Sequence, residues 1–217
     1  MCGTTTKEDA EQAVSLGVDG LGFIFVEKSP RFVEPAFARE LIAQLPPFIS
    51  RVGVFVNSSF EEIKEIVSKA GLTQVQLHGS ETPALCRELG NWNKGMSICK
   101  AFSIGKSDNP PDINAYNDVI DSLLLDTYMK GVEGGTGKVF DWKLVDRLSP
   151  TKPLILAGGL NPDNVMEAIT TVKPYAIDIN SGVEDRPGIK NHQLLEKLFA
   201  NVRLAEKQLF SSSSIYT

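Results

Sequence analysis

The sequence predicts an α/β protein that folds as a single (β/α)8 TIM barrel. Short apolar runs alternate with amphipathic stretches along the whole chain and make eight strand–helix units. Their period of roughly 25 residues suits a closed ring of repeated units. Parallel strands that are buried on both faces need helical crossovers, and 217 residues lie near the small end for this fold.

The first four units occupy the N-terminal half of the chain. The first strand is the opening segment before the helix KEDAEQAVSLG. The second is the β-branched and aromatic run Gly20–Val26, and the helix EPAFARELIAQL follows it with Pro35 in its first turn. Next comes RVGVFV with the helix SFEEIKEIVSKAG, which Ser58 or Ser59 would cap and Gly71 would end. The fourth unit is QVQLHG with ETPALCRELG.

The last four units are less regular. MSICKAF leads to a short helix around Ile113 to Tyr116, and SLLLD leads through a glycine-rich loop to DWKLVDRLS. PLILAGG precedes NPDNVMEAITTV, and AIDIN precedes KNHQLLEKLFANVRLAEKQ. We expect residues 1–205 to form the barrel and residues 206–217 to be a C-terminal tail with the composition of a disordered end. A doubly wound open sheet is the alternative, but CGTTT matches its glycine-rich first turn poorly.

Composition narrows the class of protein. The net charge of −5 and the absence of a basic run argue against a nucleic-acid partner, and no transmembrane run or secretory signal points to a membrane. The three cysteines, Cys2, Cys86 and Cys99, have no metal-ligand spacing, which favours a reducing cytoplasm. Two histidines argue against His-rich metal chemistry and a His-based triad.

The candidate site lies where barrel enzymes keep theirs, at the C-terminal ends of the strands. There Asp126 ends SLLLD, so it is either a general acid with a raised pKa or a capping or salt-bridge residue. Cys2 is either a base or nucleophile as the thiolate or an inert core thiol. Arg31 is either a fork for a carboxylate or phosphate or a solvated surface residue. For His78, a structural hydrogen bond is the favoured role.

Two glycine turns follow the seventh and eighth strands, AGG with Gly158 and Gly159, and NSG with Ser181 and Gly182. Backbone N–H groups at this corner of a barrel often bind phosphate, and glycine allows the anion to approach closely. The alternative is that these glycines only make tight turns between strand and helix.

The chain closely resembles the phosphoribosylanthranilate isomerase family over nearly its whole length. The resemblance rests on CGTTTKEDAEQAVSLGVDGLGFIF, the SPR turn, VGVFVN, VQLHG, LLLD, GGTGKVFDW, LAGGLNPDNV and DINSGVEDRPGIK, in this order and spacing. It implies an Amadori rearrangement of N-(5-phosphoribosyl)anthranilate to 1-(2-carboxyphenylamino)-1-deoxyribulose 5-phosphate in tryptophan biosynthesis, without cofactor or metal. The partner would be a small phosphorylated substrate, and the chain a monomer or homodimer.

The resemblance also implies roles for single residues. Asp126 would be the general acid that opens the ribose ring, and Cys2 the general base that takes the proton from C2. Arg31 would hold the anthranilate carboxylate, and the AGG and NSG turns would bind the phosphate. Asp178 would be a further carboxylate that faces the substrate. The GGTG sequence, residues 134–137, would be a mobile loop over the site.

Two features depart from the family pattern. Relatives carry a few residues before the cysteine, so the first strand would be short here, and Asn180 stands where serine is more common.

Other phosphosugar barrel enzymes are rival interpretations. The related isomerase of histidine biosynthesis has an aspartate pair in place of Cys2 and Asp126 and a clearer half-barrel repetition, which this sequence lacks. Indole-glycerol phosphate synthase needs a catalytic lysine at the strand ends, and we place none there. A phosphate-ligand binding protein without turnover is the rival from another class, and a substrate fluorescence assay separates it.

Overall fold

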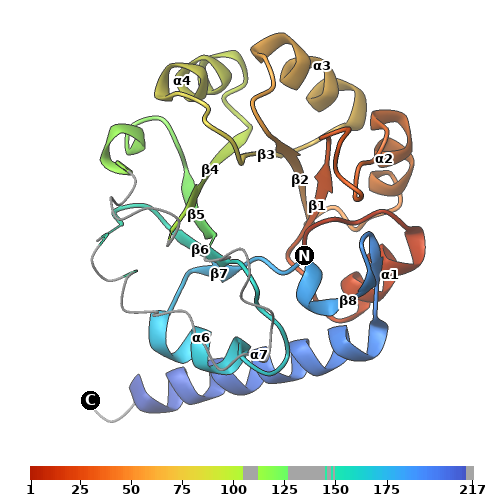
Figure 1. Cartoon of the computed structure of the whole chain (residues 1–217), viewed down its shortest axis with the longest axis vertical. Coiled ribbons are helices and arrows are strands. Elements are labelled where there is room, and N and C mark those ends of the chain that lie inside the picture. Colours follow the sequence, from red (N-terminus) through yellow and green to blue (C-terminus); the bar gives the residue numbers. More distant parts are fainter. Residues whose placement is uncertain (105–111, 127–144, 146–147, 149, 214–217) are drawn as a thin grey trace.

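The barrel is formed by seven parallel strands that pair in chain order, each with the next. The computed structural model describes residues 1–104, 112–126, 145, 148 and 150–213. Figure 1 shows the strands as an inner ring with the helices outside it. The strands are β1 (Gly20–Ile24), β2 (Ser50–Phe55), β3 (Gln74–Leu77), β4 (Ser97–Ser103), β5 (Ser122–Asp126), β6 (Leu154–Ala157) and β7 (Ala176–Ile177). This arrangement confirms the predicted barrel.

The opening segment takes the place of the eighth strand. Gly22 N donates to Met1 O at 2.8 Å, and Thr4 N donates to Gly22 O at 3.0 Å. On the other side, Cys2 N donates to Ile179 O at 2.8 Å, just beyond β7. The segment therefore pairs with β1 on one side and with the chain after β7 on the other. It closes the ring of seven strands as a very short strand at the start of the sequence.

The start of α2 and both ends of α3 lie where the local sequence signals predict. Pro35 is the first residue of α2, and the Ser59 side chain accepts from Glu62 N at the start of α3. Gly71 follows α3 with φ of +75°, a left-handed conformation that glycine adopts at low cost. The helices are α1 (Lys7–Ser15), α2 (Pro35–Ile42), α3 (Phe60–Ala70), α4 (Pro83–Trp92), α6 (Val165–Val172) and α7 (His192–Ser213), with a 3-10 turn η1 (Asn114–Tyr116).

The boundaries differ from the prediction at three places. The second predicted strand ends at Ile24 as β1, not at Val26. The tail predicted from residue 206 continues α7 as far as Ser213, because Ala205 is buried and Leu209 packs against the core. The third difference is a turn and hairpin between β7 and α7, namely η2 (Ser181–Val183), β8 (Glu184–Arg186) and β9 (Ile189–Lys190). Residues 134–137 and most of the predicted helix DWKLVDRLS lie outside the described residues.

Side chains on the strands alternate between two environments. Those that face the helices form the main core and include Phe23, Phe55 and Leu77, all fully buried. Inside the barrel, Ile24 pairs in register with Val54 and Val54 with Gln76, so that apolar and polar side chains share one layer. The layer therefore offers polar groups directly below the C-terminal ends of the strands. None of the described helices is long and apolar enough to span a membrane.

Candidate active site

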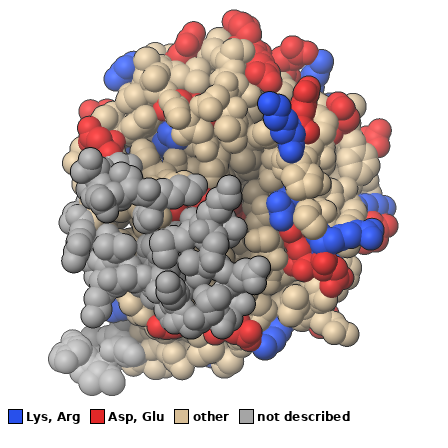
Figure 2. Space-filling view, in the orientation of Figure 1, with Lys and Arg blue, Asp and Glu red and all other residues tan. Residues whose placement is uncertain are grey.

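A cavity of about 510 Å³ opens at the C-terminal ends of the strands. In Figure 2 the surface is hollowed near the middle of the ring, with basic and acidic side chains close to one another beside the hollow. All the site residues named from the sequence line this cavity: Cys2, Arg31, Asp126, Gly158, Gly159, Asp178, Ser181 and Gly182. Apolar side chains of β1 and β2 and the residues after them complete one wall, namely Ile24, Val26, Val54 and Val56.

Cys2 lies in the short first strand with only 6% of its surface exposed. It packs closely on β1, because a Cβ atom at Gly22 would lie 3.1 Å from its Sγ atom. Burial raises the pKa of the Cys2 thiol to about 12, and the negative charge of Asp178 adds to the rise, whereas Lys190 opposes it. In the substrate-free protein, Cys2 is therefore a protonated thiol at neutral pH.

Asp126 ends β5 and is held by His78, which follows β3. His78 Nε2 lies 3.4 Å from Asp126 Oδ2, and His78 Nδ1 lies 3.2 Å from Gln76 Nε2. An amide nitrogen only donates, so with the Gln76 amide placed this way Nδ1 accepts and Nε2 carries the ring proton. The imidazole then donates to the Asp126 carboxylate.

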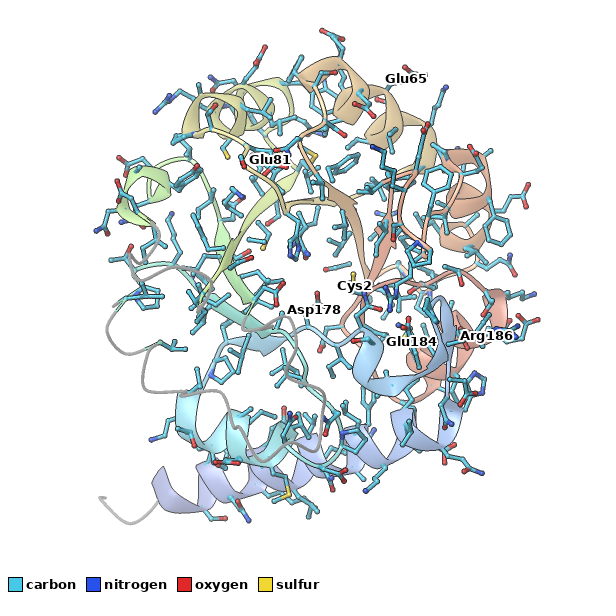
Figure 3. The ribbon with its side chains drawn as sticks, viewed as in Figure 1. Cys2, Glu65, Glu81, Asp178, Glu184 and Arg186 are labelled. Carbon is cyan, nitrogen blue, oxygen red and sulfur yellow. The ribbon has the colours of Figure 1, made fainter. Side chains whose placement is uncertain are left out.

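Asp178 follows β7 and shares the inner side of the ring with Cys2 (Figure 3). Its backbone N donates to Leu156 O at 2.8 Å, which continues the pairing of β7 with β6 beyond its last strand residue. Enclosure in the barrel raises the pKa of the Asp178 carboxyl, and the charge of Asp126 also raises it, while His78 and Lys190 lower it. Two carboxylates and a thiol thus interact electrostatically within one cavity.

The AGG and NSG turns pack against each other at one end of the cavity. Gly158 and Gly159 both adopt positive φ, +91° and +66°. A Cβ atom at Gly182 would lie only 1.9 Å from Leu160 O, so no larger residue fits where the two turns meet. Gly182 lies inside the short 3-10 turn η2.

Arg31 is not a solvated surface residue. Its Nε atom donates to Glu184 Oε1 at 2.9 Å and its Nη2 atom to Glu184 Oε2 at 2.6 Å. Lys190 Nζ donates to the same Oε1 atom at 2.9 Å. The sequence pattern predicts no role for Glu184 or Lys190, although both belong to the motif DINSGVEDRPGIK.

The other reactive side chains lie apart from this cavity. Cys86 on α4 and Cys99 on β4 are both fully buried and do not line it. Within the described part of the chain, no three His, Cys, Asp or Glu side chains are grouped so that they could hold a metal ion.

The closed barrel and its polar cavity define the class of protein: a (β/α)8-barrel enzyme whose site is built at the ends of its strands. A family model described as N-(5'phosphoribosyl)anthranilate (PRA) isomerase matches residues 1–201. The chain therefore belongs to the N-(5'-phosphoribosyl)anthranilate isomerase family, which confirms the resemblance seen in the sequence, and it is an isomerase of tryptophan biosynthesis.

Individual relatives agree with this assignment. The N-(5'-phosphoribosyl)anthranilate isomerase of Pseudomonas fluorescens (strain Pf0-1) is 46% identical over 206 residues, which cover 94% of this chain and 97% of the relative. The crystal structure of the Thermotoga maritima isomerase matches with a TM-score of 0.81 at 40% identity, over 94% of this chain and 97% of that one. A phosphoribosyl anthranilate isomerase in complex with reduced 1-(o-carboxyphenylamino)-1-deoxyribulose 5-phosphate (rCdRP) matches with a TM-score of 0.78 at 38% identity, over 93% and 96% of the two chains.

Proposed function

We propose that this chain converts N-(5'-phosphoribosyl)anthranilate to 1-(2-carboxyphenylamino)-1-deoxyribulose 5-phosphate by acid–base catalysis. The observation that carries the proposal is that Cys2 and Asp126 line one cavity together with the AGG and NSG turns. A proton donor, a proton acceptor and a phosphate site are what this isomerisation needs, and no cofactor enters the balance of atoms.

In the proposed reaction, Asp126 gives its proton to the ribose ring oxygen as the bond from that oxygen to C1 breaks. The open product is a protonated Schiff base. The Cys2 thiolate then takes the proton from C2, and the electrons of that C–H bond form the C1=C2 double bond of the enol-amine as the C1=N π electrons return to nitrogen. The enol-amine becomes the ketose when C1 gains a proton and the C2 hydroxyl loses one. Because burial raises the pKa of the Cys2 thiol to about 12, the thiolate is a minor form of the free enzyme at neutral pH.

Binding groups at two ends would fix the substrate in place. The N–H groups of the AGG and NSG turns would bind the phosphate, and Arg31 would bind the anthranilate carboxylate. The apolar wall with Ile24 and Val54 lies beside Arg31 in the same cavity, which suits an aromatic ring next to a carboxylate. Asp178 would face the sugar between the two ends.

The partner in this proposal is a small phosphorylated molecule, with no nucleic acid or membrane. Because Cys2, Cys86 and Cys99 are all free thiols, the cytoplasm is the expected compartment. We expect a monomer or a homodimer, which light scattering distinguishes.

The experiment follows the fluorescence of the anthranilate substrate in the presence of wild-type protein and of Asp126→Asn. Wild type should consume the substrate, and Asp126→Asn should lower kcat by about a hundredfold or more because the acid is lost. Binding of rCdRP should remain in both proteins, since Asn has the same shape as Asp. Wild-type protein that binds rCdRP but leaves the substrate fluorescence unchanged would favour the non-catalytic alternative.

A further inference from the structure

A cluster of three charged side chains lies at the cavity wall: Arg31, Glu184 and Lys190. Glu184 and Lys190 expose only 3% and 0% of their side chains, and neither lines the cavity, whereas Arg31 does. In Figure 3 Glu184 lies beside Cys2 on the side of the ring away from β3 and β4. Buried ion pairs are weak evidence for stability, because desolvation offsets much of their attraction. Stability alone therefore does not explain why Glu184 and Lys190 are buried beside the cavity.

Glu184 fixes the plane of the Arg31 guanidinium. A guanidinium has five N–H groups, and Glu184 takes the one on Nε and one on Nη2. Two N–H groups on Nη1 and one on Nη2 remain, and Nη1 makes no hydrogen bond to any described residue. These remaining groups form a second edge that matches the two oxygens of a carboxylate.

Lys190 offsets the charge of Glu184. Its ammonium has three N–H groups and three oxygens around it, namely Glu184 Oε1 at 2.9 Å, Asn180 Oδ1 at 3.0 Å and Asn180 O at 3.3 Å. Without Lys190, Arg31 and Glu184 would form a neutral pair that attracts an anion weakly. With Lys190 the cluster has a net charge of +1, since two cations face one carboxylate.

The cluster also joins the two ends of the cavity. Asn180, which Lys190 holds, lines the cavity and directly precedes Ser181 and Gly182 of the NSG turn. Gly3 fills the space between these parts, because its Cβ atom would lie 2.7 Å from Asn180 Oδ1 and 2.8 Å from Arg31 Cδ. Asn180 and Arg31, at the two ends of the cavity, thus both pack closely against the segment that carries Cys2.

We propose that Glu184 and Lys190 are positioning residues for the isomerase reaction: Glu184 orients Arg31 toward the substrate carboxylate, and Lys190 supplies the charge that lets the Arg31–Glu184 pair bind it. The inference rests on the proposed function, in which Arg31 binds the anthranilate carboxylate. It places both residues outside direct contact with the substrate.

The test measures the Kd of rCdRP by titration calorimetry for wild type, Glu184→Gln, Lys190→Met, Arg31→Met and the double variant Arg31→Met/Lys190→Met. Glu184→Gln should raise Kd by about tenfold or more because Arg31 loses the carboxylate that orients it, even though the net charge of the cluster rises. Lys190→Met should raise Kd by a similar factor because the cluster loses a positive charge. The same variants should raise KM for the anthranilate substrate more than they lower kcat. In the Arg31→Met background, Lys190→Met should add less than about twofold, because Lys190 acts through Arg31.

The chain contains a matched control in a second buried Lys–Glu pair. Lys100 Nζ lies 3.2 Å from Glu81 Oε2, the two side chains are 3% and 1% exposed, and neither residue lines the cavity. Figure 3 shows Glu81 on the opposite side of the ring from Glu184. Lys100→Met should lower the melting temperature but leave the Kd of rCdRP within about twofold of wild type.

Two results would overturn the proposal. One is a Kd within about twofold of wild type for folded Glu184→Gln and Lys190→Met, and the other is an equal effect of Lys190→Met with and without Arg31. If Lys190→Met does not fold, Glu184→Gln alone tests the proposal, because it keeps the size and one acceptor oxygen of the side chain. Failure of the proposed function itself looks different, since wild type would then leave the substrate unconsumed, whether or not it bound rCdRP.

Discussion

His78 Nε2 lies 3.4 Å from Asp126 Oδ2, although His78 follows β3, Asp126 ends β5, and β4 lies between these two strands. Gln76 holds the other ring nitrogen, so the proton on Nε2 faces the carboxylate. This hydrogen bond favours the charged form of Asp126, whereas the proposed reaction needs its protonated form at the start. His78 therefore orients the carboxylate that the proposed reaction uses as its acid.

The first prediction is that His78→Ala lowers kcat by about tenfold, because Asp126 loses the hydrogen bond that orients its carboxylate. The measurement is kcat at saturating substrate. His192→Ala is the control, because His192 pairs with Asp9 outside the cavity and should leave kcat unchanged. Unchanged kcat in His78→Ala would leave His78 without a role in the reaction.

The second prediction is that Cys2→Ala lowers kcat by about a hundredfold or more while the Kd of rCdRP stays near that of wild type. A base acts in the transition state, so its loss affects turnover more than affinity. Cys2→Ser should be nearly as slow, since a hydroxyl is a far weaker acid than a thiol. Cys86→Ala serves as the control, because Cys86 is buried away from the cavity. Unchanged kcat in Cys2→Ala would remove the assignment.

The third prediction concerns the protonation of Cys2 in the substrate-free protein. Burial raises the pKa of its thiol to about 12, so the reactive thiolate is scarce at neutral pH and grows as pH rises. The rate of alkylation of Cys2 by iodoacetamide should rise about tenfold per pH unit from pH 7 to pH 10. Peptide mass spectrometry distinguishes Cys2 from Cys86 and Cys99. A plateau reached between pH 7 and 8 would show that the site stabilises the thiolate.

The fourth prediction is that Gly158→Val weakens the binding of inorganic phosphate and of substrate. Gly158 has φ of +91° beside the NSG turn, where a β-branched residue is both strained and bulky. Phosphate affinity can be measured by competition with rCdRP. Gly17→Val is the matched control, since Gly17 has φ of +89° at the end of α1, away from the cavity. Both variants should lose stability, but equal phosphate affinities in the two would contradict a phosphate site at Gly158.

Local signals in the sequence were sufficient for much of the fold. Pro35, Ser59 and Gly71 mark helix ends through steric and hydrogen-bonding preferences that act within a few residues, and the structure has all three in the predicted places. α7 continues beyond its predicted end to Ser213. The residues after Ala205 are mostly polar, so the sequence gives little sign that Leu209 continues the helix against the core. A helix end of this kind depends on packing as well as on local composition.

The sequence by itself determined which residues share the site, since parallel strands that close into a barrel bring their C-terminal ends to one rim. Cys2, Asp126 and the two glycine turns are far apart in the chain, but all lie at or just beyond the C-terminal ends of strands. The tertiary structure alone decided the partners of these residues. Arg31 and Glu184 are separated by 153 positions, and no local pattern encodes their contact. It also decided the protonation of Cys2, because a pKa depends on burial and on the charges of side chains that only the folded barrel brings near.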